Sequence, residues 1–246
     1  MRKILLGSLI IAVAAVAVSL GRWQLRRLAQ REASNRVFLA ARALTPIRLP
    51  DDIRPGLIID SGRRIVARGH FEPSHQILLR DRVQDDAPGL QVVTLFETDS
   101  TGPALWVLRG FVRSPDAVTP PDSIPSPQAG DVSLDGEALA IPVTGDSGRP
   151  LAREGITTWQ RLDQQALRGL GPPALPVYLL LRGDSSGPGQ LPTVAAPAIS
   201  NGPHLSYAIQ WFGIAAAVLT FGVVVIWRGE NRGTKSDDVR HRQRAP

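Results

Sequence analysis

The sequence predicts an α+β membrane protein in which two transmembrane helices, one near each end, flank a single mainly antiparallel β domain with one or two helices of its own. Two uncharged runs, residues 4–20 and 205–227, predict the spans, because a helix needs about 20 such residues to cross the hydrocarbon core of a bilayer. Between them, roughly 180 residues form short apolar runs separated by turn formers, which indicates strands around one sizeable core.

The N-terminal run follows two basic residues, an order that is also typical of a cleavable signal peptide with residues 17–19 as its cleavage site. The run is long for a signal, however. Residues 21–32 continue it with apolar residues on one helical face and arginines elsewhere. We therefore expect a retained transmembrane helix at residues 4–20 that extends beyond the membrane.

The distribution of basic residues predicts the orientation. Residues 183–227 contain no Lys or Arg, whereas the tail at residues 228–246 is rich in them. The positive-inside rule therefore places the C-terminus in the cytoplasm, two spans place the N-terminus there too, and residues 21–203 form an extracytoplasmic domain. Four arginines after the first span argue for the opposite orientation, but a long translocated loop obeys the rule weakly; they are Arg22, Arg26, Arg27 and Arg31.

Composition narrows the classes of partner and chemistry. The net charge of +6 comes mostly from arginines that flank the spans, so it favours membrane lipid head groups as partners and not nucleic acid. The chain has no cysteine, which excludes disulfides, thiolate catalysis and cysteine-ligated metal or iron–sulfur sites.

Most of the central segment reads as strands. Runs at 90–97 and 104–112 pair as a hairpin, while Leu162, Ala166 and Leu167 share a face in a helix over residues 159–170. Thr157 or Thr158 is the expected N-cap of that helix. Proline and glycine indicate loops at 115–130 and 183–203. The remaining expected strands lie at 64–69, 77–80, 131–138 and 177–182.

Two motifs resemble loops that carry a nucleophilic serine. Residues 183–187 fit the Gly-x-Ser-x-Gly elbow around Ser185, but the prolines that follow exclude the helix such an elbow must enter. Residues 145–148, around Ser147, match the serine-protease loop in four residues only, and the domain has too few strands for two barrels. We interpret both as turns, and nothing in the sequence specifies an enzyme.

A possible metal site lies near the first strands. His70, Glu72 and His75 fall within six residues, and strand alternation places His70 and Glu72 on one face. Residues 71–74 look like a turn that leaves the strand, so His75 need not join them. Solvated turn residues are the favoured interpretation, and a zinc or copper site is the alternative.

The most informative segment is Pro203–Phe212, where the second uncharged run begins. His204 stands where the span meets water, and Tyr207, Trp211 and Phe212 form an aromatic belt below it. A single imidazole at this depth is a candidate ligand for an amphiphilic cofactor such as haem. The alternative is an interfacial histidine that only caps the helix.

These segments together resemble the Surfeit locus protein 1 family of membrane-anchored cytochrome c oxidase assembly factors. Residues 203–212 carry the most specific part of the resemblance, and Trp159 with Asp163 add to it. Leu90, Leu108 and Phe111 replace the family's usual Tyr, Asn and Trp but keep apolar volume on the strands. The other matching segments are 21–27, 69–71 with 77–79, 88–95 and 105–112.

The resemblance implies a role in assembly and not in catalysis. Family members assist insertion of haem A into the catalytic subunit of cytochrome c oxidase and receive haem from haem A synthase, in a bacterium at the cytoplasmic (inner) membrane. His204 matches the proposed haem ligand. Around it we expect Trp23 and Trp211 as apolar walls, Arg22 and Arg26 as partners of the propionates, and Tyr207 as a further cofactor-binding residue. The alternative is a scaffold that holds an oxidase intermediate and binds no cofactor.

Overall fold

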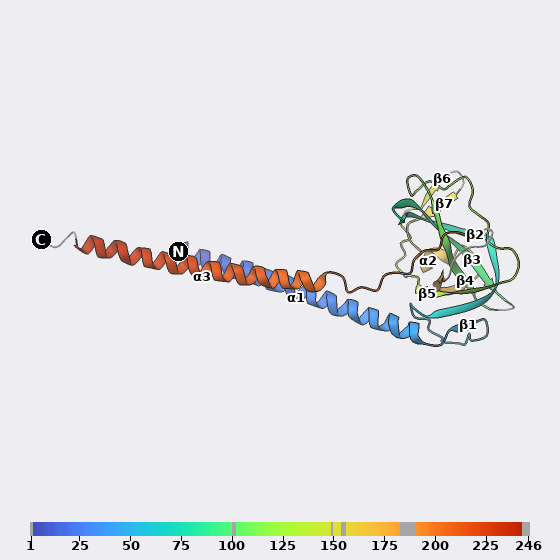
Figure 1. Ribbon diagram of the computed structural model, residues 1–246, viewed down its shortest axis with the longest axis horizontal. Helices are drawn as coiled ribbons and strands as arrows, with labels where there is room; N and C mark the ends of the chain where they lie inside the picture. Colours follow the sequence, from blue (N-terminus) through green and yellow to red (C-terminus); the bar gives the residue numbers. More distant parts are fainter. Residues whose placement is uncertain (1, 100–101, 149, 154–155, 183–189, 243–246) are drawn as a thin grey trace. The chain divides into compact units, whose positions relative to one another are not determined.

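The computed structural model describes residues 2–99, 102–148, 150–153, 156–182 and 190–242. It contains two compact units, one made of Met1–Asn35 with Ile199–Pro246 and the other of Arg36–Ala198. The first unit is helical and the second holds all the strands (Figure 1). The predicted class, two long apolar helices that flank a mostly antiparallel β domain, is confirmed.

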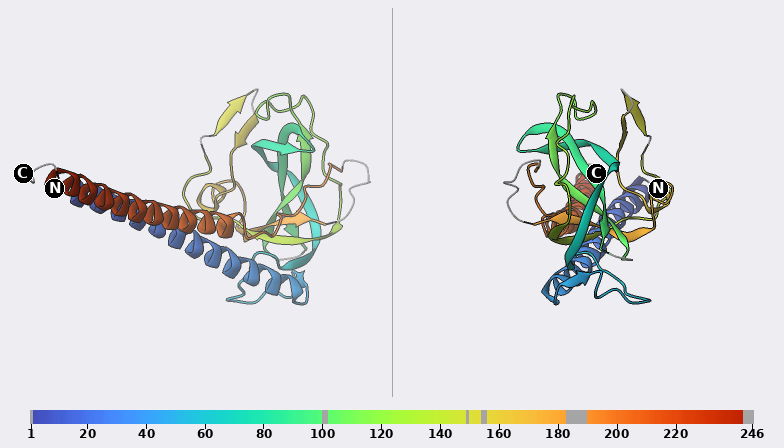
Figure 2. Two further views of the ribbon diagram at one scale, coloured as in Figure 1. Left: turned by 60° about the vertical axis from the view of Figure 1, so that its left-hand side comes forward. Right: turned by 90° about the vertical axis from the view of Figure 1, so that its right-hand side faces the viewer.

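The helical unit is an antiparallel pair formed by α1 (Arg2–Ala43) and α3 (His204–Arg242) (Figure 2). Both helices are long and apolar enough to cross a membrane. Gly21 lies against Phe212 so closely that a Cβ would come within 2.8 Å of its ring, and Gly222 lies against Ile10 in the same way. Small residues therefore let the two backbones approach, as is usual between membrane helices.

Small side chains continue this contact along both helices. Ala14, Ala17, Ala208 and Ala215 are each at most 5 % exposed. On α1 the buried positions 14, 17 and 21 alternate in steps of three and four, the spacing of a coiled-coil seam. The expected continuation of the first helix past residue 20 is confirmed, since α1 ends only at Ala43.

The sheet unit is built on one long bent strand. The strands are β1 (Ile47–Leu49), β2 (Arg64–Gln84), β3 (Ala87–Thr98), β4 (Ala104–Arg113), β5 (Val132–Ala140), β6 (Leu151–Arg153), β7 (Ile156–Trp159) and β8 (Ala174–Leu181). The first part of β2 pairs with β5 and the second part with β3, so that β2, β3, β4, β8 and β5 form a closed ring of hydrogen-bonded strands.

Gly69 is the point at which β2 changes neighbour. It pairs with Thr98 of β3 and with Val132 of β5. Its φ is +153°, and a Cβ there would lie 2.0 Å from the carbonyl oxygen of Glu97. Only glycine fits such a close approach of backbones, so this residue allows the strand to close the ring.

Two expectations about β2 need correction. Residues 64–69 and 77–80 belong to one strand, and the segment 71–74 between them is not a turn. A bulge between Glu72 and Gln76 takes up the Pro73 region, because proline has no N–H to donate and is tolerated in sheets at bulges. The predicted hairpin of 90–97 with 104–112 is confirmed as β3 and β4.

The helix expected over residues 159–170 is also wrong in extent. Ile156–Trp159 is β7, and only Gln164–Leu167 is helical, as α2. The N-cap is Asp163, and not Thr157 or Thr158, because its carboxylate accepts hydrogen bonds from the N–H groups of Gln165 and Ala166. Trp159 and Leu162 are buried in the sheet's core instead. The segments 115–130 and 190–203 contain neither helix nor strand before α3, as expected.

A buried ion pair fixes the last turn of α1 to the sheet. Glu137 of β5 is 2 % exposed, and its Oε2 lies 3.3 Å from Nε of Arg42. Its Oε1 has no hydrogen-bond partner among the residues that the structure describes. Removing the cation that pairs with such a carboxylate leaves a buried charge without that partner.

We therefore expect Arg42→Ala to lower the free energy of unfolding of the sheet unit by about 1–3 kcal/mol. Adding Glu137→Met should recover much of the loss, because the double variant buries no charge. Chemical denaturation of the solubilised full chain measures the free energy of unfolding of both variants. Arg48→Ala, at an exposed position, is the control. Equal stabilities for wild type and Arg42→Ala would contradict the importance of the pair.

Candidate functional site

The candidate site lies at the first residue of α3, where the helical pair brings together residues far apart in sequence. The carbonyl oxygen of Pro203 accepts hydrogen bonds from the N–H of Tyr207 and the hydroxyl of Ser206, which starts the helix at His204. The Nδ1 of His204 lies 2.9 Å from Oε1 of Gln24 on α1. The imidazole is half-buried.

The other ring nitrogen of His204 faces a glycine. Gly202 has φ +65°, in the left-handed region that glycine favours, and a Cβ there would lie 3.5 Å from Nε2 and Cδ2 of the imidazole. Because glycine has no side chain, residue 202 has none that could cover this side of the imidazole ring. When Nδ1 donates to Gln24, the lone pair of a neutral imidazole is on Nε2.

A second polar contact holds the segment that precedes α3. The side-chain amide of Asn35 donates to the carbonyl oxygen of Ser200 at 3.3 Å and to Oδ1 of Asn201 at 2.9 Å. The Asn35 and Gln24 contacts therefore fix both the approach to α3 and its first residue. His204 thus has a defined orientation, and is not a free interfacial side chain.

The depth of the site follows from the helix register. Because Gly21 contacts Phe212, the first two turns of α3 lie beside the charged turns of α1, beyond its uncharged run at residues 4–20. His204 therefore lies at the level of Gln24, where one helix is already polar. This is the environment of a membrane interface.

The predicted aromatic residues differ in their positions relative to His204. Trp211 lies seven residues, about two turns, further along the same stripe of α3 and is half-buried. Tyr207, one turn along, is 46 % exposed, and Trp23 is 50 % exposed. Both rings thus have a free face at the level where such rings commonly meet lipid head groups.

The structure does not bring Arg22 and Arg26 to this side of α1. Each lies two residues from Gln24, about 200° around the helix, and both are exposed. Arg31, seven residues on, shares the stripe of Gln24, and Arg27 flanks it. The cations closest in angle to the His204 side are therefore the second pair of arginines.

The donor set suits a haem and does not suit a bare metal ion. No cluster of three or more His, Asp or Glu side chains occurs among the described residues, so the described part of the chain offers no chelate for a free ion. A haem brings its own four nitrogen ligands and needs an axial donor from the protein, which a half-buried imidazole with one nitrogen hydrogen-bonded can supply. The chain has no cysteine, and its one methionine is Met1.

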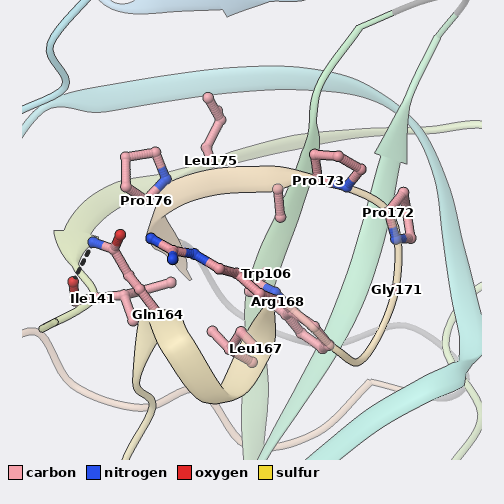
Figure 3. A pocket seen from close by; sticks show the side chains of 11 residues that line it. Trp106, Ile141, Gln164, Leu167, Arg168, Gly171, Pro172, Pro173, Leu175 and Pro176 are labelled. Atoms are coloured by element: carbon pink, nitrogen blue, oxygen red, sulfur yellow. Dashed lines mark hydrogen bonds between the residues drawn. The ribbon is translucent and has the colours of Figure 1, made fainter. Parts of the chain in front are cut away.

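The sheet unit has its own cavities. One of about 510 Å3 lies between α2 and the start of β8, and its walls are polar and apolar in about equal parts (Figure 3). Trp106, Leu167 and Pro172 contribute to these walls, Gln164 is held by the carbonyl oxygen of Ile141, and the guanidinium of Arg168 is the charged group at the cavity.

A second, smaller cavity of about 180 Å3 contains Arg109 in its wall. Arg109 is 6 % exposed, lies 5.8 Å from the ring centre of Phe71, and donates to Oε1 of Gln76 and to the carbonyl oxygen of Pro125. Burial lowers the pKa of its guanidinium to about 10. It remains charged at neutral pH and ties β4 to the proline-rich loop.

The described residues of the other candidate motifs make side-chain contacts within the sheet unit. The hydroxyl of Ser147 donates to the carbonyl oxygen of Gly148. His75 Nδ1 lies 3.1 Å from the hydroxyl of Ser74, which donates to Glu72, while His70 faces Glu97 at 3.8 Å. Ser185 and its elbow lie outside the described residues.

Sequence reasoning missed Gln24 and Asn35. Both lie on the stripe of α1 that begins at Ala14 and continues in steps of three and four residues through Gly21 and Gln24. A polar amide on an otherwise small-residue stripe of a membrane helix indicates a hydrogen-bond partner on the facing helix. If the two spans are assumed to pair, this pattern in the sequence indicates Gln24 and Asn35.

Comparison with known proteins gives the family. Residues 11–216 match the model of the SURF1 family. The chain belongs to the SURF1 family. It is 29 % identical over 238 residues to a SURF1-like protein of Monosiga brevicollis, covering 91 % of this chain and 88 % of that protein.

Two further SURF1 relatives carry more specific names. Surfeit locus protein 1 of Mus musculus is 24 % identical over 230 residues, which cover 85 % of this chain and 71 % of the mouse protein. The cytochrome oxidase assembly protein SHY1 of Saccharomyces cerevisiae is 29 % identical over 120 residues, or 48 % of this chain and 30 % of the yeast protein.

Proposed function

We propose that this SURF1-family chain is an assembly factor for the haem-copper cytochrome c oxidase and assists insertion of haem A into the catalytic subunit. Its direct partners would be that subunit, haem A synthase and membrane lipid. The observation that carries the proposal is the oriented imidazole of His204 at the entrance of the helical pair, in a chain of the family to which an oxidase assembly protein is related.

Each proposed site residue has a physical task. His204 would hold the iron through Nε2, and a bound haem would supply the iron and an amphiphilic macrocycle suited to an interface. Trp211, Tyr207 and Trp23 provide aromatic surface at this level. Arg22 and Arg26 supply positive charge on the outer side of α1, where anionic groups of cofactor or lipid can approach.

The angular positions of Arg27 and Arg31 make them further candidates for the propionates. They lie closer in angle to the His204 side of α1 than the first two arginines do. Arg27 and Arg31 would hold the carboxylates of a bound haem, because guanidinium groups bind carboxylates in bidentate geometry.

The second candidate is a scaffold that holds an oxidase intermediate through its spans and sheet and binds no cofactor. The cavity beside Arg168 and the exposed apolar faces of both helices offer surfaces for such a role. A scaffold does not need the imidazole of His204, whereas a haem carrier does. Substitution of this one side chain therefore separates the two functions.

The proposed function requires the sheet unit to be extracytoplasmic and both termini to be cytoplasmic. The six Lys and Arg residues after Trp227, against none in residues 183–227, motivate this orientation. We expect a periplasmic phosphatase fused at Pro125 to be active, and the same enzyme fused at the C-terminus to be inactive. An inactive Pro125 fusion with an active C-terminal fusion would reverse the topology.

A further inference from the structure

We propose that Gln24 is the positioning residue of this site: its side-chain oxygen holds the imidazole of His204 in the Nδ1–H tautomer and directs Nε2 towards the ligand. The inference deepens the proposed function and rests on it for the identity of the ligand. It names a residue that sequence analysis did not single out, on the helix opposite the histidine.

Geometry is the first argument. The Gln24 oxygen and His204 Nδ1 are 2.9 Å apart, a normal hydrogen-bond length, although the residues are 180 positions apart in sequence. Helix α1 presents Gln24, and α3 begins with His204, so the contact exists only when the two helices pair. The segment before His204 is held separately by Asn35, which limits movement of the ring away from Gln24.

The amide of Gln24 is a polar group at the contact between the two helices. Gln24 continues the stripe of Ala14, Ala17 and Gly21 on α1, and it is half-buried. A polar group between membrane helices is unfavourable unless it is hydrogen-bonded. The bond to the imidazole provides that hydrogen bond for the side chain of Gln24.

The chemistry of an imidazole ligand also favours this role for Gln24. Neutral histidine has one N–H and one lone pair, and fixing the N–H at Nδ1 places the lone pair on Nε2. Histidines that bind metals nearly always donate their other N–H to a carbonyl, carboxylate or water, which fixes the ring and increases its basicity. Gln24 provides such an acceptor, and Gly202 beside Nε2 has no side chain that would cover this nitrogen.

The test begins without haem. The full chain, labelled with 15N-histidine in detergent micelles, has four histidines, and the His204 signal is assigned by its absence from His204→Ala. We expect a protonated Nδ1 and an unprotonated Nε2 in wild type. Gln24→Leu should shift the ring towards the Nε2–H tautomer, while Gln24→Glu should retain Nδ1–H.

Gln30→Leu is the matched control. Gln30 is an exposed glutamine of the same helix whose oxygen accepts from Arg27 and which has no contact with His204 among the bonds that the structure describes. Its substitution should leave the His204 signal unchanged. Circular dichroism of each variant checks that both helices are present.

Titration with haem A then measures the consequence for binding. Gln24→Leu should weaken affinity about tenfold or more, the usual cost of losing the partner of a metal-bound histidine. Gln24→Glu should bind, and its carboxylate should lower the reduction potential of the bound haem. If the tautomer of His204 is unchanged in Gln24→Leu, the inference is wrong, whether or not haem A binds. Failure of wild type to bind haem A would instead overturn the proposed function, so the two failures are distinct.

Discussion

Replacing His204 with alanine is expected to remove most of the haem A that co-purifies with the chain while leaving the protein inserted and folded. The imidazole is the one strong iron donor at the start of α3, because residues 205–227 contain no other His, no Cys and no Met. The loss should be at least about tenfold, since even removal of a partner of a metal-bound histidine costs that much.

Insertion should survive this change. His204 lies at the edge of an uncharged run of α3, whose transfer into the bilayer depends on the apolar residues that follow. The sheet's core, which lies in residues 36–198, does not include it.

The control is His70→Ala, which removes an exposed histidine of the sheet unit. Haem per polypeptide, measured by the pyridine haemochrome spectrum after detergent extraction, compares the three proteins. Equal haem in wild type and His204→Ala, or none in either, would favour the scaffold.

The largest effect on stability is expected at Asp163. This side chain is fully buried, and its two oxygens accept five hydrogen bonds. Oδ2 accepts from the N–H and hydroxyl of Thr144 and from the N–H of Gly145, while Oδ1 accepts from the N–H groups of Gln165 and Ala166. One carboxylate thus caps α2 and holds the loop after β5.

Asp163→Asn should therefore lower the melting temperature by roughly 5–10 °C. Asparagine has the same shape but only one oxygen, so its amide N–H2 must face at least two of the donors that now point at a carboxylate. Differential scanning calorimetry of the solubilised chain measures the shift, with the exposed Asp51→Asn as control. A shift no larger than that of the control would show that the cap is not needed.

The difference in stability between wild type and Asp163→Asn should change with pH in a definite direction. Burial alone would raise the pKa of Asp163, but hydrogen bonds from Thr144, Ala166 and Gln165 to its ionised form lower it overall. A carboxyl group whose pKa is lower in the folded state stabilises that state fully at any pH above its unfolded pKa of about 3.9. The contribution is lost as the pH falls from there towards the folded pKa. The gap between wild type and Asp163→Asn should thus be constant near neutral pH and narrow below about pH 4.

The sequence predicted the features that depend on local pattern. The two spans follow from uncharged length, and the β3–β4 hairpin follows from two apolar runs around a turn. The error at residues 159–170 has a physical cause. Leu162, Ala166 and Leu167 have helical spacing, but tertiary contacts place Trp159 in β7, and the buried cap at Asp163 delays the helix.

Features that depend on long-range pairing were not predictable from one sequence. The closed ring requires β2 to pair with two different strands, and only the close backbone approach at Gly69 reveals where it turns. The site behaves in the same way. His204 is visible as an imidazole at the start of a span, whereas Gln24 becomes part of the site only through the register of two helices 180 positions apart.

The haem A content of the oxidase catalytic subunit, measured per polypeptide in cells whose only change is His204→Ala in this chain, tests the central claim most directly. The subunit is isolated from wild-type, variant and deletion cells, and its haem A is measured against its protein. If the chain hands haem A to the subunit through His204, the variant subunit should be as poor in haem A as that from deletion cells, although the variant chain is present at normal abundance. A variant subunit with the wild-type haem A content would contradict the account.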